Sequence, residues 1–218
     1  MKTKIFFYIS VLLLSIFPFK SFSNNITYLN SYELKGEKNF INGYESQNEN
    51  GTYNAVIEIS AGSNEKWEVS KDGELIKLEF KNGKPRIIDY IGYPVNYGFI
   101  PKTLLPNSEG GDGDQLDILV FSQSPLTRGQ VVEVRIIGML KMKDEGLLDN
   151  KILAILDDSS GFYRIKSIND LDTKYPGILE IIRIWFSNYK GTVSSLEGYE
   201  KTKKTIKLIK KSIKFYYE

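Results

Sequence analysis

The sequence predicts an α+β, mainly β protein: a small, mostly antiparallel barrel or curved sheet with helices packed outside it. Two patterns support this fold class. Between residues 53 and 156, short apolar or alternating segments are separated by Gly, Asn, Asp and Ser turns, as in strands joined by hairpins. From Ile178 onward, apolar side chains recur at helical spacing.

Six segments have the pattern of strands. They are Tyr53–Ile59, Lys66–Val69, Leu75–Phe80, Asp117–Phe121, Val131–Met142 and Lys151–Leu156. Asp72-Gly73 and Asn82-Gly83 are dipeptides that favour tight turns, so we expect hairpins at both places. The connection Tyr90–Gly111 contains three prolines, and we expect it to be non-helical.

Two helices are expected at the end of the chain, over Ile178–Tyr189 and Leu196–Tyr217. The second contains a run of lysines: Lys201, Lys203, Lys204, Lys207, Lys210, Lys211 and Lys214. A basic helix can bind nucleic acid or a membrane surface, or it can be an ordinary solvated face. We favour the solvated face and expect no nucleic-acid partner, because the mature chain is almost neutral.

The first 23 residues have the pattern of a secretory signal peptide. Lys2 and Lys4 precede an apolar run that ends before Pro18, and small residues precede a cleavage point after Ser23. The run is shorter than the roughly 20 residues that span a bilayer, so we expect no stable membrane insertion after cleavage. We therefore expect an exported protein, periplasmic or secreted. Removal of residues 1–23, which contain three lysines and no acid, changes the formal charge from +2 to −1.

Residues 24–51 are polar and rich in Asn, Ser and Gly, which predicts a loosely ordered N-terminal lead-in. The folded domain is expected over residues 52–218. The chain has no Cys and no His, which excludes disulfides, thiolate and imidazole metal sites, and Ser-His-Asp or cysteine nucleophiles. Catalysis would have to use carboxylates, Lys, Arg, Tyr, hydroxyls and metals bound through oxygen.

Acidic residues cluster where two predicted strands meet loops. Asp112-Gly113-Asp114-Gln115-Leu116-Asp117 runs into an apolar strand, and Asp144, Glu145 and Asp149 follow another. Each group alone could be a solvated acidic turn. Together they could hold hard divalent cations, because carboxylate oxygens suit Mg²⁺, Mn²⁺ or Ca²⁺. With the cationic and phenolic side chains nearby in the sequence, they indicate phosphoryl transfer to a metal-activated water.

Together these motifs resemble those of the family I soluble inorganic pyrophosphatases. That family's signature is matched by Asp112–Ile118 except at Gln115, and the resemblance extends from about Val56 to Lys190. It implies a five-stranded, OB-like barrel that hydrolyses inorganic diphosphate to two orthophosphates by direct attack of a metal-activated water. It also implies two or more Mg²⁺ ions per site, with Mn²⁺ as an alternative, and a homo-oligomer that is hexameric in bacterial members.

The resemblance also implies roles for individual residues. Asp114 would be the general base, and Tyr93 would lie close to the reacting group. Phosphate would be bound by Lys66, Arg86, Tyr97, Lys151, Tyr189 and Lys190. Metals would be held by Asp112, Asp117, Asp144, Asp149, Glu58 and Glu68.

Three features depart from the family pattern: Gln115, a longer loop over Thr103–Gly111 and the exported N-terminus. Two other functions stay open at this point. One is a non-catalytic exported module that binds divalent metal or phosphate through the same acids. The other is a phosphatase with a broader substrate range.

Overall fold

The computed structural model describes residues 25–158, 161–191 and 194–218, so the predicted signal peptide lies outside the described residues. The strands are β1 (Thr27–Asn30), β2 (Glu33–Lys35), β3 (Tyr53–Ile59), β4 (Trp67–Val69), β5 (Leu75–Leu78), β6 (Phe80–Lys81), β7 (Lys84–Pro85), β8 (Asn96–Phe99), β9 (Asp117–Phe121), β10 (Val131–Asp144), β11 (Leu147–Leu148), β12 (Lys151–Leu156) and β13 (Ser194–Lys201). The helices are η1 (Asn107–Glu109), α1 (Ile168–Lys174), α2 (Ile178–Asn188) and α3 (Thr202–Tyr217). In the described residues, no helix is long and apolar enough to cross a membrane.

Five strands close into a ring, which confirms the predicted OB-like barrel. The order is β3, β8, β9, β12 and β10, and β10 then pairs with β3 again; only the β9–β12 pair is parallel. The 14-residue strand β10 makes closure possible, because its first half pairs with β3 and its second half with β12 and β13. Its register shifts between Ile136 and Gly138, a β-bulge that bends the strand around the barrel.

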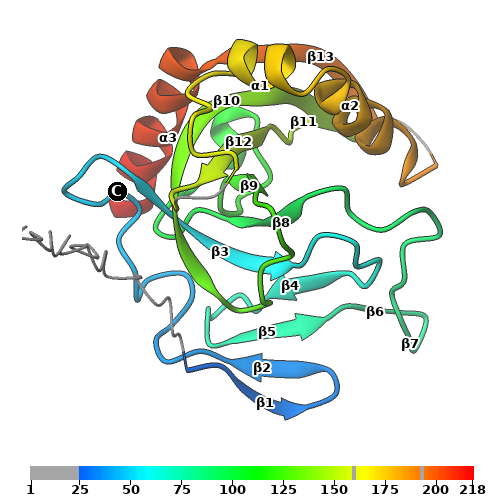
Figure 1. Cartoon of the computed structure of the whole chain (residues 1–218). Coiled ribbons are helices and arrows are strands. Elements are labelled where there is room, and N and C mark those ends of the chain that lie inside the picture. The colour runs from blue at the N-terminus through cyan, green and yellow to red at the C-terminus, as the bar shows by residue number, and fades with distance from the viewer. Residues whose placement is uncertain (1–24, 159–160, 192–193) are drawn as a thin grey trace, which may run out of the picture.

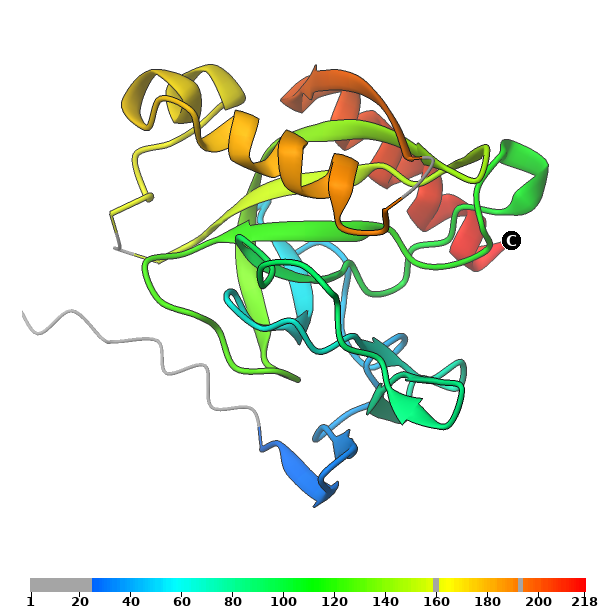
Figure 2. The same cartoon turned by 90° about the vertical axis from the view of Figure 1, so that its right-hand side faces the viewer.

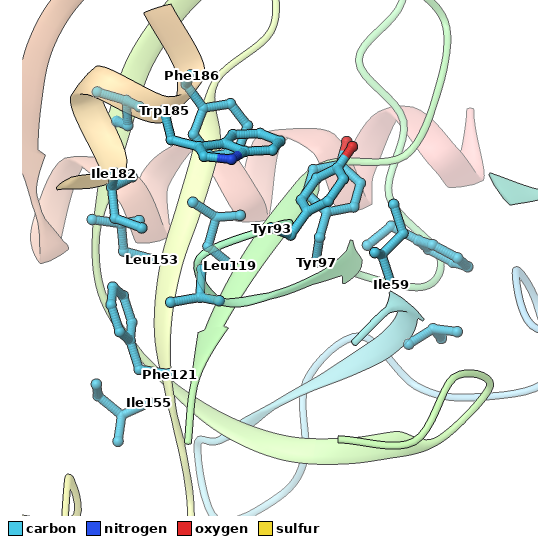
Figure 3. Close-up of a cluster of buried hydrophobic side chains, with 14 of the residues drawn as sticks. Ile59, Tyr93, Tyr97, Leu119, Phe121, Leu153, Ile155, Ile182, Trp185 and Phe186 are labelled. Carbon is cyan, nitrogen blue, oxygen red and sulfur yellow. The ribbon is translucent and has the colours of Figure 1, made fainter. Parts of the chain in front are cut away.

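Successive residues of the barrel strands enter two separate cores. In β9, Leu119 packs with Trp185 of α2, whereas Val120 packs with Ile209 of α3. Figure 3 shows the first of these cores, in which α2 lies over Leu119 and Leu153. Both faces of β9 and β12 are covered, so these strands are apolar except for their first residues, Asp117 and Lys151.

Residues 25–51, the described part of the predicted lead-in, form two strands and bury apolar side chains, whereas a loosely ordered segment was expected. Strands β1 and β2 extend β5 and β4 into a four-stranded sheet on the side of the barrel opposite the helices (Figures 1 and 2). Leu34 and Phe40 are completely buried, and the Phe40 amide donates to the Gly73 carbonyl at 2.8 Å. Apolar anchors spaced within a polar segment therefore fix the lead-in.

Three further expectations needed correction. The last helix begins at Thr202 and not at Leu196, because residues 194–201 form β13 along β10. The connection Tyr90–Gly111 was expected to be non-helical, but it contains the short 3₁₀ helix η1 as well as the barrel strand β8. Helix α1 was not anticipated, because its seven residues are too few for a clear helical period.

Candidate active site

The predicted site residues converge on two adjoining cavities beside the barrel. One, of about 240 Å³, is lined by Lys66, Glu68, Arg86, Tyr97, Asp112, Asp114, Asp117, Asp144, Glu145, Leu147, Asp149, Lys151, Tyr189 and Lys190. The other, of about 420 Å³, shares the wall formed by Lys66, Tyr97 and Asp117 and adds Glu58. The side chains come from β3, β4, β8, β9, β10, β11 and β12, from the loops between strands, and from the end of α2.

Lys151 joins the acids of two separate segments. Asp117 and Lys151 are the first residues of the parallel strands β9 and β12, so both lie at the same edge of the barrel. The Lys151 ammonium contacts Asp117 and lies 2.6 Å from Asp149 Oδ1. Burial opposes the charge on Lys151, but the two carboxylates outweigh it and raise the pKa of the lysine above its ordinary value.

The two carboxylates beside Lys151 differ in their electrostatics. Burial raises the pKa of Asp149 to about 6. Burial acts in the same direction on Asp117, but the Lys151 ammonium and the Tyr97 hydroxyl outweigh it and lower the pKa of that carboxyl. Asp117 therefore stays ionised over a wider pH range than Asp149, as an oxygen ligand for a cation requires.

Aromatic rings form one wall of the site. Tyr93 is buried between Trp185, whose ring centre lies 4.4 Å away, and Tyr97, at 5.3 Å. Trp185 in turn stacks on Tyr189 at 4.4 Å. Figure 3 shows the hydroxyls of Tyr93 and Tyr97 directed to the same side. Tyr93 lines neither cavity, but its ring lies close to those of Tyr97 and Tyr189, which line the smaller one.

Lys66, in the connection between β3 and β4, provides a second cation. Lys66 Nζ lies 2.9 Å from Glu68 Oε1 and 5.1 Å from the centre of the Tyr97 ring. Burial opposes its charge, but Tyr93, then Glu68 and Glu58, raise the pKa of Lys66 above its ordinary value. Burial raises the pKa of Glu58 to about 8, although Lys66 and the amide of Val69, which donates to Glu58 Oε1 at 2.7 Å, act against this rise.

Arg86 is held at the rim by a residue that the sequence did not single out. Its Nη1 lies 2.8 and 2.6 Å from the two carboxylate oxygens of Glu79, across the β6–β7 hairpin. The Asn-Gly turn between those strands could have indicated that the two side chains face one another, since it fixes the hairpin register.

The acidic loop before β9 is stabilised locally. Asp112 Oδ1 accepts the amide of Asp114 at 3.0 Å, which closes a short turn. Burial, and then the carboxylates of Asp112 and Asp117, raise the pKa of Asp114. A carboxyl with a raised pKa is a stronger base, which fits the general-base role implied for Asp114.

Asp144 and Lys190 complete the opposite rim, where the Lys190 ammonium contacts the Asp144 carboxylate. Asp144 ends β10 and Lys190 follows α2, so this ion pair joins the barrel to the helical layer. Lys71, which also lines the larger cavity, was not singled out from the sequence.

The charges of the smaller cavity bear on whether it could hold metal ions. Seven carboxylates and four cationic side chains line it, a formal charge of −3, which would repel an anionic ligand. Divalent cations would reverse that sign, and carboxylate oxygens are suitable donors for them. In residues 25–158, 161–191 and 194–218, no three acids lie close enough to hold a metal as they stand. Lysines lie against these acids: Lys151 against Asp117 and Asp149, and Lys190 against Asp144. The donor chemistry therefore fits, with the lysine ammonium groups as competitors for the same oxygens.

Comparisons with known proteins identify the family of the chain. A family model described as inorganic pyrophosphatase matches residues 55–217. A soluble inorganic pyrophosphatase of Arabidopsis thaliana is 40% identical over 139 residues, which cover 63% of this chain and 58% of the plant protein. An inorganic pyrophosphatase of Nostoc is 36% identical over 170 residues, which cover 76% and 92% of the two chains.

Comparison with solved structures identifies the same family. The crystal structure of a type I inorganic pyrophosphatase from Plasmodium falciparum superimposes with a TM-score of 0.78 at 28% identity, over 88% of this chain and 72% of the other. The matched part of the chain begins within β3, so the β1–β2 hairpin precedes the region that the family model covers.

Proposed function

The chain belongs to the inorganic pyrophosphatase family, and on this premise we propose that its cavity hydrolyses inorganic diphosphate to two orthophosphates with the help of bound Mg²⁺. The observation that carries the proposal is the convergence of seven carboxylates and four cations on one small cavity. The oxygens of a diphosphate are stabilised by cations around them. The lysine and arginine side chains are four such cations, and the carboxylates can bind divalent metal ions as further ones.

The residues divide into two groups by charge. Asp112, Asp117, Asp144 and Asp149, together with Glu58 and Glu68, would hold the metal ions. Bound there, Mg²⁺ would neutralise phosphate charge and lower the pKa of a coordinated water. We propose two or more such ions per site, with Mn²⁺ as an alternative.

The chain's own side chains bind the substrate and move the proton. Lys66, Arg86, Lys151 and Lys190 donate to phosphate oxygens, together with the hydroxyls of Tyr97 and Tyr189. Lys151 and Lys190 can exchange their present carboxylate partners for phosphate. Asp114 accepts the proton of the attacking water. The ring of Tyr93 lies against the rings of Tyr97 and Tyr189 and helps to hold them in place.

Phosphate release tests this function. Purified protein beginning at Asn24 should release two orthophosphates per diphosphate with Mg²⁺ and none with a chelator. An organic phosphate monoester should be turned over far more slowly. Metal binding without turnover, or equal rates on the monoester, would contradict the proposal and favour a binding module or a broad phosphatase.

We also propose export and assembly. The basic start and apolar run of residues 1–23 support export, and N-terminal sequencing of the protein from fractionated cells tests it. Ile181 and Ile184 are exposed on α2, and Ile91, whose carbonyl accepts from Trp185 of that helix, is exposed too. These apolar side chains support a homo-oligomer, which the family resemblance suggests is a hexamer. Light scattering that gives the mass of a single chain would contradict assembly.

A further inference from the structure

An arginine outside the cavities contacts the backbone or side chains of three residues around the site. Arg128 lies in the loop between β9 and β10 and lines neither of the two cavities described above. Its Nε donates to the backbone carbonyl of Glu58 at 3.1 Å, and its Nη2 lies 3.0 Å from Glu65 Oε2. The centre of its guanidinium lies 3.8 Å from the centre of the Trp67 ring.

These contacts form one connected cluster. Trp67 Nε1 donates to the same oxygen, Glu65 Oε2, at 2.8 Å, so the carboxylate joins the arginine and the indole. Trp67 is buried, and the Arg128 side chain is only 13% exposed. A planar guanidinium suits this position, because it can stack on a ring while its edge donates to two acceptors at once.

The cluster brackets Lys66 along the chain. Glu65 and Trp67 are the residues immediately before and after it, so Arg128 fixes the chain on both sides of Lys66. The backbone of Lys66 is also paired, with its amide donating to the Arg86 carbonyl at 3.0 Å and its carbonyl accepting from Glu79 at 2.8 Å. The direction of the Lys66 side chain into the cavity therefore depends in part on Glu65, Trp67 and Arg128, which line neither cavity.

We propose that Arg128 is a positioning residue that, through Glu65 and Trp67, places the Lys66 ammonium for diphosphate binding. The proposal rests on the proposed function of the site. Loss of Arg128 removes two hydrogen bonds and a stacked cation, so the segment 65–67 can shift and Lys66 meets its phosphate oxygen less often. This lost interaction is made in the ground state and the transition state alike, so it raises KM more than it lowers kcat.

A double-mutant cycle tests the proposal. Arg128→Ala should raise KM for Mg²⁺-diphosphate about tenfold and change kcat by no more than about threefold. In a Lys66→Ala background, Arg128→Ala should have no further effect on kcat/KM, since a residue that acts through Lys66 has nothing left to position. Arg128→Lys keeps the charge but lacks the planar fork, so KM should fall between wild type and Arg128→Ala.

Arg135→Ala is the matched control. Arg135 pairs with Asp157 at 2.8 Å and donates to the Ile165 carbonyl at 3.1 Å, an arginine cluster of the same kind that also lines neither cavity. It should leave KM unchanged. An unchanged KM in Arg128→Ala, full additivity with Lys66→Ala, or the same rise of KM in Arg135→Ala would overturn the proposal.

The same cycle can be measured by calorimetric binding of imidodiphosphate, a diphosphate analogue with a nitrogen bridge. If the wild type binds the analogue but releases no phosphate from diphosphate, the proposed function fails, while binding of the analogue still tests the positioning role. Non-additive losses of affinity for Arg128→Ala and Lys66→Ala would then support the positioning role, and additive losses would overturn it.

Discussion

Lys151 is the residue at which the acids of the site meet. Its side chain is buried between Asp117 and Asp149, so one ammonium compensates two carboxylates that would otherwise repel each other. The same arrangement explains why the residue suits phosphate binding. An ammonium that is already desolvated and oriented loses little freedom when a phosphate oxygen replaces a carboxylate oxygen.

Replacement of Lys151 tests this balance. Lys151→Met keeps the volume but leaves two buried carboxylates without their cation, which should lower the free energy of unfolding by about 3–5 kcal/mol in a chelator. Mg²⁺ should recover part of that loss, because a divalent ion can compensate the same carboxylates. Urea unfolding with and without Mg²⁺ measures both values, and an equal loss under the two conditions would contradict the account.

Glu58 should make stability depend on pH. Its carboxyl has a pKa of about 8 in the folded chain, above its ordinary value, so the folded state holds a proton that the unfolded state releases. The resulting cost to stability is absent at low pH, grows as pH rises above about 4, and is complete above pH 8.

Glu58→Gln should therefore be more stable than the wild type at pH 8 by a few kcal/mol, and nearly equal to it at pH 4. Urea unfolding in a chelator at the two pH values measures the difference. The exposed Glu49→Gln serves as control and should show no such trend. A stability difference that stays constant with pH would mean that Glu58 is ionised in the folded protein. The same variant should lose activity, because the amide is a poorer metal ligand than a carboxylate.

At the scale of elements, the site depends on strand ends that the barrel topology brings together. The parallel pair β9–β12 places Asp117 beside Lys151, and β10 carries Asp144 to the same side after its bulge near Gly138. Trp185 of helix α2 stacks on Tyr189 in the aromatic wall of the site. Lys190 follows the end of this helix and pairs with Asp144. No single element contains the site, so its assembly depends on closure of the ring.

The N-terminal segment is part of this architecture. Phe40 is completely buried and Ile41, the next residue, lines the larger cavity. Phe40→Ala should therefore lower the free energy of unfolding by about 3–5 kcal/mol, the usual cost of removing a buried aromatic side chain.

Thermal or urea unfolding measures this effect. Tyr28→Ala, which removes an aromatic side chain that is 55% exposed on β1, is the control and should change stability by less than about 0.5 kcal/mol. If Phe40→Ala were as mild as Tyr28→Ala, the segment would be a loose lead-in after all.

At the scale of the whole molecule, the sequence predicted those elements whose structure is determined by neighbouring residues. Long apolar strands such as β9 and β12 and the acidic run before β9 could be identified, because burial on both faces and ligand chemistry leave marks in neighbouring residues. Strand β13 could not be identified from the sequence, because its extended form comes from pairing with β10 and its apolar spacing continues into α3.

Short elements were missed for a similar reason. Strand β8 has four residues and depends on β3 and β9 for its hydrogen bonds. Helix α1 did carry a local signal: Ser167 Oγ accepts the amide of Asp170, while the Asp170 carboxylate accepts the amide of Lys166. The contacts of Arg128 join residues 70 and 63 positions apart in the chain, and no pattern along the sequence indicates them.

The central claim is that carboxylates from separate strands act together, through divalent cations, in one hydrolytic site. Titrating Mg²⁺ while following phosphate release by the wild type, Asp117→Asn and the exposed control Asp72→Asn tests it most directly. We expect saturable activity for the wild type and the control, and a loss of at least about a hundredfold for Asp117→Asn with the fold intact. Wild-type rates from Asp117→Asn, or full activity without any divalent ion, would contradict the claim.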